Sequence, residues 1–375
     1  MLGASLARQI GQDRFVVAGL AIPDVTGKLK TSKAEEPPPT IRIVAVPIVD
    51  AESGESVAVT AEIERIVFDE IRRASTTFSV ERMTPNNLQA ADHILFGTII
   101  FDTYQQKRRN DQKRYHVYCT IVEKASKRIV ARADAWISNR DLNYSPAEMF
   151  QDSPVFPRDR RLQSLVAIAK SPLGAIADNE YYDSLETNAL IAEAETTFAR
   201  GDYRQALELF RKAADRPDGQ VIKTYIGLYR SQIKQMDLKA AEETFAKLLP
   251  IAAEEGSLST KFLFTVNSTE FVSDRGLRSQ YDMWIRQMAR YFSSRSDCLR
   301  IVGHSSRTGS EQYNDQLSLM RAEQLRARLG ANAPVLIDKS TAIGVGFSQN
   351  IIGSGTDDAR DALDRRVEVS LRGCS

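Results

Sequence analysis

An arginine lies on the apolar side of a predicted helix in the C-terminal third of the chain. The stretch GHSSRTGSEQYNDQLSLMRAEQLRARL, residues 303–329, places Arg321 four residues after Leu317 and four before Leu325. This spacing puts the three side chains on one helix face. A buried guanidinium needs a partner, and its planar donors fit a carboxylate. The residues leave open whether that carboxylate belongs to a ligand or to this chain.

Residues that could catalyse a reaction or bind a metal are scarce elsewhere. The chain has three histidines and three cysteines, all scattered and without the CxxC spacing of a zinc site. No paired-carboxylate or nucleophile constellation accompanies them. We therefore predict no catalytic residue, no metal site and no cofactor, and we interpret His304 as a structural residue of a turn.

The charge balance and hydropathy exclude two further classes of protein. With 50 basic and 49 acidic residues, the net charge is +1, which gives no general attraction to nucleic acid. The basic run QQKRRNDQKR, residues 105–114, is interpreted as a solvated hairpin turn, with a phosphate or partner site as the alternative. The apolar run FVVAGLAI, residues 15–22, is far shorter than the ~20 residues of a transmembrane helix. Whether a signal or lipid anchor has been removed stays open.

The first folded domain is predicted over residues 41–140, after an extended lead-in over 1–40 that contains the linker-like DVTGKLKTSKAEEPPPT. Its alternating and helical patterns predict a small α/β sandwich. The predicted elements are strands 41–49, 93–104, 114–123 and 128–138 and a helix over 60–76. With the segment Ala91-Asp92-His93-Ile94-Leu95-Phe96-Gly97, this pattern resembles the CsgG-like and TolB amino-terminal domains of bacterial envelope proteins.

A connector over 141–185, with a helix at 160–170, precedes a helical segment over 186–256. Two stretches, 188–217 and 224–252, repeat a small–large pattern in which Ala206 and Ala241 are 35 residues apart. The pattern resembles the tetratricopeptide repeat, with Met236 in place of the turn glycine. Two repeats are fewer than a free-standing array needs, so we expect them to pack on a neighbouring domain. A spacer and a peptide-binding scaffold are both open roles.

The C-terminal domain, residues 260–375, is predicted to follow a βαβαββ order. Its strands are predicted over 260–268, 298–305, 340–350 and 365–373, and its helices over 273–294 and in the stretch around Arg321. Cys298 starts one strand and Cys374 follows the last. If those strands are antiparallel neighbours, the two cysteines approach disulfide distance, which would fit an oxidising compartment. Cys119, inside a strand, is predicted to be a buried apolar residue.

The same domain resembles the OmpA-like peptidoglycan-binding domains. The matching residues are Gly303, His304, Thr308, Gly309, Tyr313, Asn314, Leu317, Ser318, Arg321, Ala322 and Leu329, with ALDRRVEVSL (362–371) as the closing strand. The resemblance implies a site for the diaminopimelate moiety of the stem peptide, formed by Arg321, Ser306, Thr308, Asn314, Leu317 and Arg365. Arg321 would pair with the ligand's carboxylate. Ser306 stands where the family has the Asp that faces the ligand's amine, so this contact would lose its charge.

These patterns together predict a multidomain α+β protein. It would have an N-terminal α/β sandwich, central tetratricopeptide-like hairpins and a C-terminal OmpA-like domain. The resemblances imply a non-enzymatic, periplasmic, outer-membrane-associated scaffold of a Gram-negative envelope. It would anchor a secretion or motility assembly to peptidoglycan and meet other envelope proteins through its N-terminal and helical parts. The alternatives are a regulator of a cell-wall synthase and an OmpA-like fold that has lost wall binding and serves protein contacts.

Overall fold

The chain is a mixed α and β protein with two compact units. The computed structural model describes residues 41–74, 78–104, 112–137, 142–256, 258, 260–350 and 364–374. The first unit comprises Met1–Asn143 with Arg160–Thr196, and the second comprises Tyr144–Asp159 with Thr197–Ser375. Neither unit is therefore one continuous stretch, and the predicted connector 141–185 contributes to both. The predicted lead-in 1–40 and most of the basic run 105–114 lie outside the described residues.

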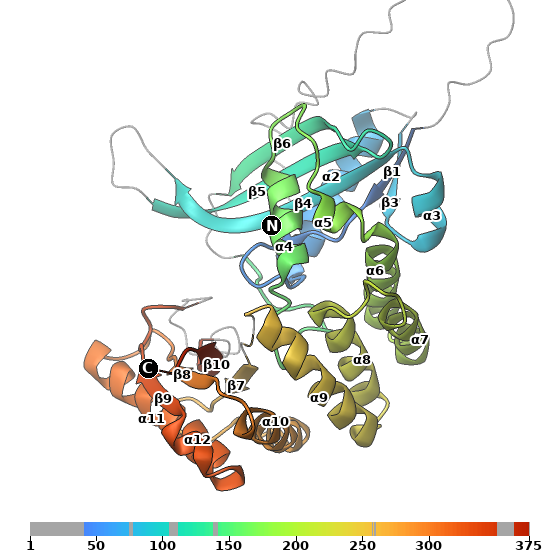
Figure 1. Cartoon of the computed structure of the whole chain (residues 1–375). Coiled ribbons are helices and arrows are strands. Elements are labelled where there is room, and N and C mark those ends of the chain that lie inside the picture. The colour runs from blue at the N-terminus through green and yellow to red at the C-terminus, as the bar shows by residue number, and fades with distance from the viewer. Residues whose placement is uncertain are drawn as a thin grey trace, which may run out of the picture. The chain divides into compact units, whose positions relative to one another are not determined.

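The first unit is built on a sheet in the order β3-β1-β4-β5-β6, with β2 paired to β4 (Figure 1). Strands β4, β5 and β6 form the predicted antiparallel meander, and β1 runs parallel to both β3 and β4. The strands are β1 Ile41–Ala45, β2 Val49–Asp50, β3 Phe78–Arg82, β4 His93–Tyr104, β5 Gln112–Glu123 and β6 Ile129–Ile137. The predicted strand 41–49 is thus interrupted around Pro47, whose ring nitrogen cannot donate to a ladder. Strand β3 was not predicted.

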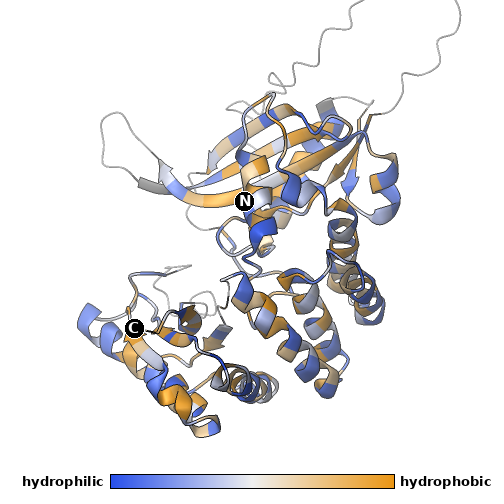
Figure 2. Ribbon diagram, viewed as in Figure 1, coloured by the Kyte–Doolittle hydropathy of each residue, from blue (hydrophilic) through white to orange (hydrophobic). Residues whose placement is uncertain are grey.

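Helices cover both faces of this sheet. Figure 1 shows α2 on one face of β4 and β5 and α4 on the other. The helices are α2 Ala58–Ala74, α3 Pro85–Ala90, α4 Arg160–Lys170 and α5 Asn179–Tyr182. Figure 2 shows hydrophobic residues concentrated along β4 and β5, where Phe96, Tyr118 and Val122 join Leu165 and Ile168 in one core. Helix α4, predicted as part of a connector, is therefore a layer of the first unit.

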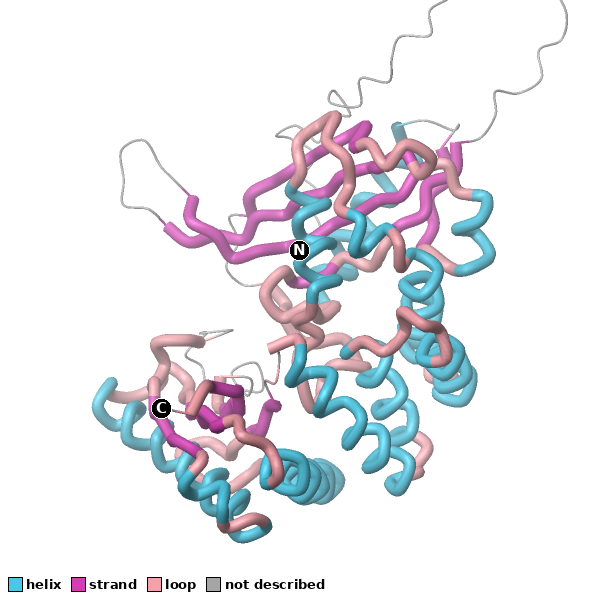
Figure 3. The backbone as a smooth tube through the Cα atoms, in the orientation of Figure 1, coloured by secondary structure: helices cyan, strands magenta, loops and turns pink. Residues whose placement is uncertain are grey.

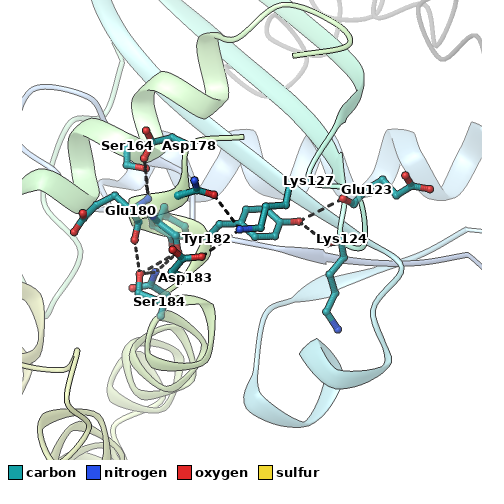
Figure 4. Close-up of polar contacts among 12 residues, drawn as sticks. Glu123, Lys124, Lys127, Ser164, Asp178, Glu180, Tyr182, Asp183 and Ser184 are labelled. Carbon is teal, nitrogen blue, oxygen red and sulfur yellow. Dashed lines mark hydrogen bonds and ion pairs between the residues drawn. The ribbon is translucent and has the colours of Figure 1, made fainter. Parts of the chain in front are cut away.

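Hydrogen bonds and an ion pair join α5 and the residue after it to the turn between β5 and β6 (Figure 4). The Tyr182 hydroxyl donates to the carbonyls of Glu123 and Lys124 at 3.5 and 3.3 Å. The Lys127 ammonium reaches the Asn179 side chain at 2.9 Å and the Asp183 carboxylate at 3.2 Å. Burial raises the pKa of Tyr182 to about 12, so the phenol stays protonated as a donor at neutral pH.

Helices α6 to α9 follow one another without a strand (Figure 3). Their bounds are α6 Leu185–Ala199, α7 Tyr203–Ala214, α8 Ile222–Lys234 and α9 Leu238–Glu254. The turn before α7 and the turn before α9 have the same geometry. Gly201 and Met236 have φ of 83° and 62°, and Asp202 and Asp237 cap the next helix by accepting from Gln205 N and Ala240 N. The 35-residue sequence repeat is thus a repeat of conformation.

The second unit contains a four-stranded sheet in the order β7-β10-β8-β9. The elements are β7 Thr260–Leu263, α10 Arg275–Ser293, β8 Cys298–Gly303, α11 Glu311–Asn332, α12 Val335–Asp338, β9 Ser340–Gly344 and β10 Arg366–Arg372. This is the predicted order with the short α12 added. Strand β7 ends five residues before the predicted limit of 268, and β9 ends at 344, not 350. As predicted, β8 and β10 are antiparallel neighbours.

Helices α8 and α9 share one core with this sheet. The Trp284 indole N–H of α10 donates to the Tyr229 hydroxyl of α8 at 2.8 Å, and that hydroxyl donates to Gln280 Oε1 at 2.8 Å. The Phe245 ring of α9 lies 5.9 Å from that of Trp284, and Phe262 of β7 lies 5.8 Å from it. The second helical repeat therefore packs on the C-terminal part of the chain.

The three cysteines have different roles. A disulfide joins Cys298, at the start of β8, to Cys374, just beyond β10, across a Cα–Cα distance of 5.1 Å. Because Arg372 is paired with Cys298 in the ladder, the end of the chain is held against the neighbouring strand. Cys119 is buried within β5, and burial raises the pKa of its thiol to about 12.

The left-handed conformation of Met236 gives a prediction for stability. A side chain with a Cβ in this left-handed region costs about 1–2 kcal/mol, and glycine avoids that cost. Glycine also makes the unfolded chain more flexible, which offsets part of the gain in stability. We expect Met236→Gly to raise the free energy of unfolding by about 1 kcal/mol in urea denaturation. Gly201→Ala, at the equivalent turn, is the matched control and should lower it. A loss of stability in Met236→Gly would contradict this account.

Candidate functional site

Arg321 lies within the packing face of α11. Ser310 caps the helix by accepting from the Tyr313 backbone N–H at 3.3 Å, and the helix then runs to Asn332. Leu317 and Leu325 are 4% and 0% exposed, and Arg321 between them is 0% exposed. The guanidinium is thus as fully buried as the leucines on either side of it.

Three backbone carbonyls accept hydrogen bonds from the Arg321 guanidinium. Nε donates to Ser268 O at 2.9 Å, Nη1 to His304 O at 3.2 Å and Nη2 to Thr265 O at 2.9 Å. The guanidinium carbon also lies 5.4 Å from the centre of the Phe264 ring. One side chain therefore joins the loop after β7 to the end of β8. Carbonyl oxygens are good acceptors for guanidinium donors and carry no formal charge of their own.

Small residues bring the helix close to the sheet at this point. A Cβ on Gly303 would lie 1.8 Å from the carbonyl oxygen of Ser318, so no larger residue fits at the end of β8. The Ser318 hydroxyl donates to Asp315 O at 2.8 Å and accepts from Gly346 N–H at 3.0 Å. These contacts fix α11 over β8 and the end of β9, and so fix Arg321 under the loop that begins at His304.

That loop carries the other residues predicted for the site. Ser306 is 6% exposed, while Thr308 is exposed. The Asn314 amide donates to the carbonyls of Thr308 and Ser310 at 2.9 and 3.1 Å, and Gly309 has the left-handed φ of 97°. Asn314 therefore shapes the loop through its backbone, and Ser306 brings a neutral hydroxyl to the position that the family resemblance assigns to an acid.

A buried ion pair lies beside His304. Arg366 Nε is 2.6 Å from Glu368 Oε1. Burial would raise the pKa of Glu368, but Arg366 outweighs it and the pKa falls to about 2. Burial, reinforced by Arg366, lowers the pKa of His304 to about 3. The imidazole is therefore neutral at physiological pH, and its ring nitrogens have no hydrogen-bond partner in the described part of the chain.

The structure brings only some of the predicted residues together. Leu317 lies one turn before Arg321 in the core. Arg365 is 6% exposed, and its carbonyl accepts from Phe264 N–H at 2.9 Å, next to the ring that faces Arg321. The role predicted for each residue toward a ligand stays a prediction. Sequence reasoning missed the carbonyls of Thr265 and Ser268, because a backbone acceptor has no residue-type signature.

Within the described ranges, no group of three or more His, Cys, Asp or Glu side chains is arranged to hold a metal ion. None of the helices described in the structure is both long and apolar enough to cross a membrane.

Comparison with known proteins gives structural similarity only. No family model and no curated protein matches the chain. Similar solved structures include the peptidoglycan-associated lipoprotein of Burkholderia pseudomallei, at 24% identity over 30% of this chain and 89% of that chain. The periplasmic domain of MotB is 14% identical over 33% of this chain and 72% of that chain. The cell wall anchor of the T6SS from Pseudomonas aeruginosa is 20% identical over 38% and 96%. Each of these three matches has a TM-score of 0.25.

The carbonyl contacts predict a large structural role for Arg321. Arg321→Met keeps the apolar stem but removes three donors, and each buried acceptor left unpaired costs about 1–3 kcal/mol. We expect the free energy of unfolding in urea to fall by about 3–5 kcal/mol. Arg328→Met, on the same helix with its Nη1 3.8 Å from Asp282, is the matched control and should cost below about 1 kcal/mol. Equal losses in the two variants would refute this role.

The buried imidazole predicts a pH dependence of stability. His304 has a lower pKa when folded than the ordinary value of 6.5, so only the unfolded chain takes up its proton as pH falls from 6.5 towards 3. Its contribution to stability is present above pH 6.5 and is lost below it, at up to about 1.4 kcal/mol per pH unit. In urea unfolding from pH 7 to pH 4, His304→Leu should lose less stability than the natural chain. Parallel profiles would contradict this assignment.

Proposed function

We propose that this protein is a non-enzymatic scaffold of a bacterial cell envelope that binds peptidoglycan through the second unit. The binding surface would be the loop 304–310 and the start of α11, with Arg321 beneath them. Reversible, non-covalent binding of a stem peptide requires charge and shape, and no catalytic group. This binding surface therefore suits a protein that attaches an envelope assembly to the wall.

The buried cation at Arg321 is the observation that carries this proposal. Its formal charge lies directly under the loop, and the low dielectric of a protein interior strengthens its attraction for an anion. A carboxylate of the stem peptide is such an anion. The long sequence pattern around Arg321, from Gly303 to Leu329, is the pattern that resembles peptidoglycan-binding domains. The proposal assigns Arg321 the role of a fixed positive charge that orients the ligand.

An oxidising compartment agrees with this role. Disulfides persist in secreted and periplasmic proteins and are rare in the cytosol. The Cys298–Cys374 disulfide therefore favours a location in the periplasm. There the first unit and the helices α6 to α9 would be available to other envelope proteins.

One residue favours a second candidate function. Ser306 is neutral, so an ammonium group of the ligand would find a hydroxyl there and not a carboxylate, and charge-assisted hydrogen bonds are roughly twice as strong as neutral ones. Loss of that charge is consistent with a fold that no longer binds the wall and instead makes protein contacts. The two candidates differ in whether the natural chain binds peptidoglycan at all.

Co-sedimentation with purified sacculi separates the candidates. We expect the full natural chain to pellet with diaminopimelate-type sacculi, and Ser306→Asp to bind about tenfold more tightly, an increase worth about 1.4 kcal/mol. Arg321→Lys keeps the charge but cannot hold all three carbonyls that Arg321 joins, so the loop above it loses its fixed shape and binding should weaken.

The control is Ser273→Asp, which adds the same charge at an exposed position just before α10. It should bind like the natural chain. Binding by Ser306→Asp but not by the natural chain would support the second candidate. If neither chain pellets with sacculi while both show cooperative unfolding, the wall-binding proposal is wrong.

A further inference from the structure

Strands β3 and β6 form the two edges of the sheet in the first unit (Figure 1). The chain itself covers the edge of β3. The Arg72 guanidinium donates to the Val80 carbonyl at 2.9 Å. The Asn87 amide donates to the Arg82 carbonyl at 2.8 Å. Such cover matters because a strand edge whose N–H and C=O groups lack partners is a template for pairing with another strand.

The start of β6 is covered by the segment that follows α4. Ile129 N–H donates to the Ala175 carbonyl at 2.9 Å, and the Ile129 carbonyl accepts from Gly174 N–H at 2.8 Å. The ladder between β5 and β6 has an irregularity near this point, between Ile121 and Val122 of β5. Strand β6 continues beyond this cover to residue 137.

Two residues in the later part of β6 point their backbone groups away from β5. Glu123 hydrogen-bonds through its N–H and its C=O to the turn that leads into β6, at 2.8 and 2.9 Å. Because backbone groups alternate along a strand, Cys119 also points toward β6, where it is paired with Ala133. The neighbours of Ala133, Arg132 and Asp134, therefore point outward. Their N–H and C=O groups have no hydrogen-bond partner in the described part of the chain.

The side chains of these two residues carry opposite charges on one face of the sheet. Arg132 Nη2 is 3.5 Å from Asp134 Oδ1, and the side chains are 33% and 39% exposed. Asp134 Oδ2 is 2.7 Å from His116 Nε2. The Arg132 Nε atom is buried and has no hydrogen-bond partner among the described residues. Helix α4 packs on β4 and β5, inward of β6. A guanidinium with an unused donor at the rim of a sheet favours a further acceptor from outside.

The charges of this edge are complementary to themselves in one register. When two copies of β6 lie antiparallel with Ala133 opposite Ala133, each Arg132 lies opposite Asp134 of the other copy. The backbone fits the same register, because the outward N–H and C=O of Arg132 then face the outward C=O and N–H of Asp134. A register centred on Asp134 would place the two aspartates opposite each other, and like charges in that position are destabilising.

We propose that the outer edge of β6 pairs with the same edge of a second copy of this chain, in the antiparallel register centred on Ala133. The pairing joins two sheets into one continuous sheet and brings a carboxylate to Arg132. Charges on an edge strand normally block pairing, and here they block every partner except a strand with the matching order of charges. The contact is small, so the dimer is reversible. This inference concerns the first unit and does not rest on the proposed peptidoglycan site.

Charge reversal within β6 tests the pairing in the full chain. Sedimentation velocity over a dilution series should show the natural chain in a reversible equilibrium between monomer and dimer. Arg132→Asp and Asp134→Arg each place like charges opposite one another, so each variant alone should associate at least about tenfold more weakly. An equimolar mixture of the two variants restores opposite charges at both positions and should recover the dimer.

The matched control is Arg211→Asp, which reverses an exposed arginine of α7 that pairs with Glu208 at 2.8 Å. It should associate like the natural chain. Arg132→Asp keeps the contact between Asp134 and His116, so it tests the pairing even if Asp134→Arg does not fold. Thermal unfolding of each variant establishes that it is folded.

Four outcomes would overturn the proposal. A natural chain that stays monomeric at about 100 µM would leave this edge to a strand of another protein. A dimer that Arg132→Asp leaves intact would place the contact elsewhere on the chain. Equal weakening by Arg211→Asp would show a general effect of charge. A mixture of the two folded β6 variants that stays monomeric would exclude the register centred on Ala133.

Discussion

The buried guanidinium of Arg321 is the constraint on which the C-terminal part of the structure depends. A charge in the interior must be given acceptors, and here the backbone supplies them from the loop after β7 and the end of β8. Those segments are far apart in the sequence, so the arginine fixes how they close around α11. Gly303 and Ser318 allow the helix to approach closely enough for that contact. The loop proposed to meet the wall takes its shape from the same packing.

A second polar group within an apolar setting joins the helical repeats to the sheet. Tyr229 accepts from Trp284 and donates to Gln280, so its hydroxyl is satisfied within a cluster of rings. Helix α10 covers the side of α8 and α9 that carries Tyr229 and Phe245. Helices α8 and α9 and the C-terminal sheet therefore belong to one folded unit.

Periodic patterns in the sequence predicted much of this structure. They did not predict the contacts that the backbone makes. The Leu317, Arg321 and Leu325 stripe, the order of strands and helices along the C-terminal part and the 35-residue repeat all depend on side-chain type and spacing. Strand β3 is only five residues long, and its neighbours are set by parallel pairing that leaves no local signal. The acceptors of Arg321 are carbonyls, which every residue has. The return of residues 160–196 to the first unit likewise has no periodic signature.

The interleaved order of the two units has a mechanical consequence. The chain passes from the first unit to the second after Asn143, returns after Asp159 and passes again after Thr196. Three covalent connections therefore run between the units where a simple tandem arrangement has one. If the second unit is attached to a rigid wall and the first to a moving assembly, tension is divided among three strands of chain. Pulling the two units apart then requires the loss of tertiary structure in at least one of them, in contrast to the extension of a single linker.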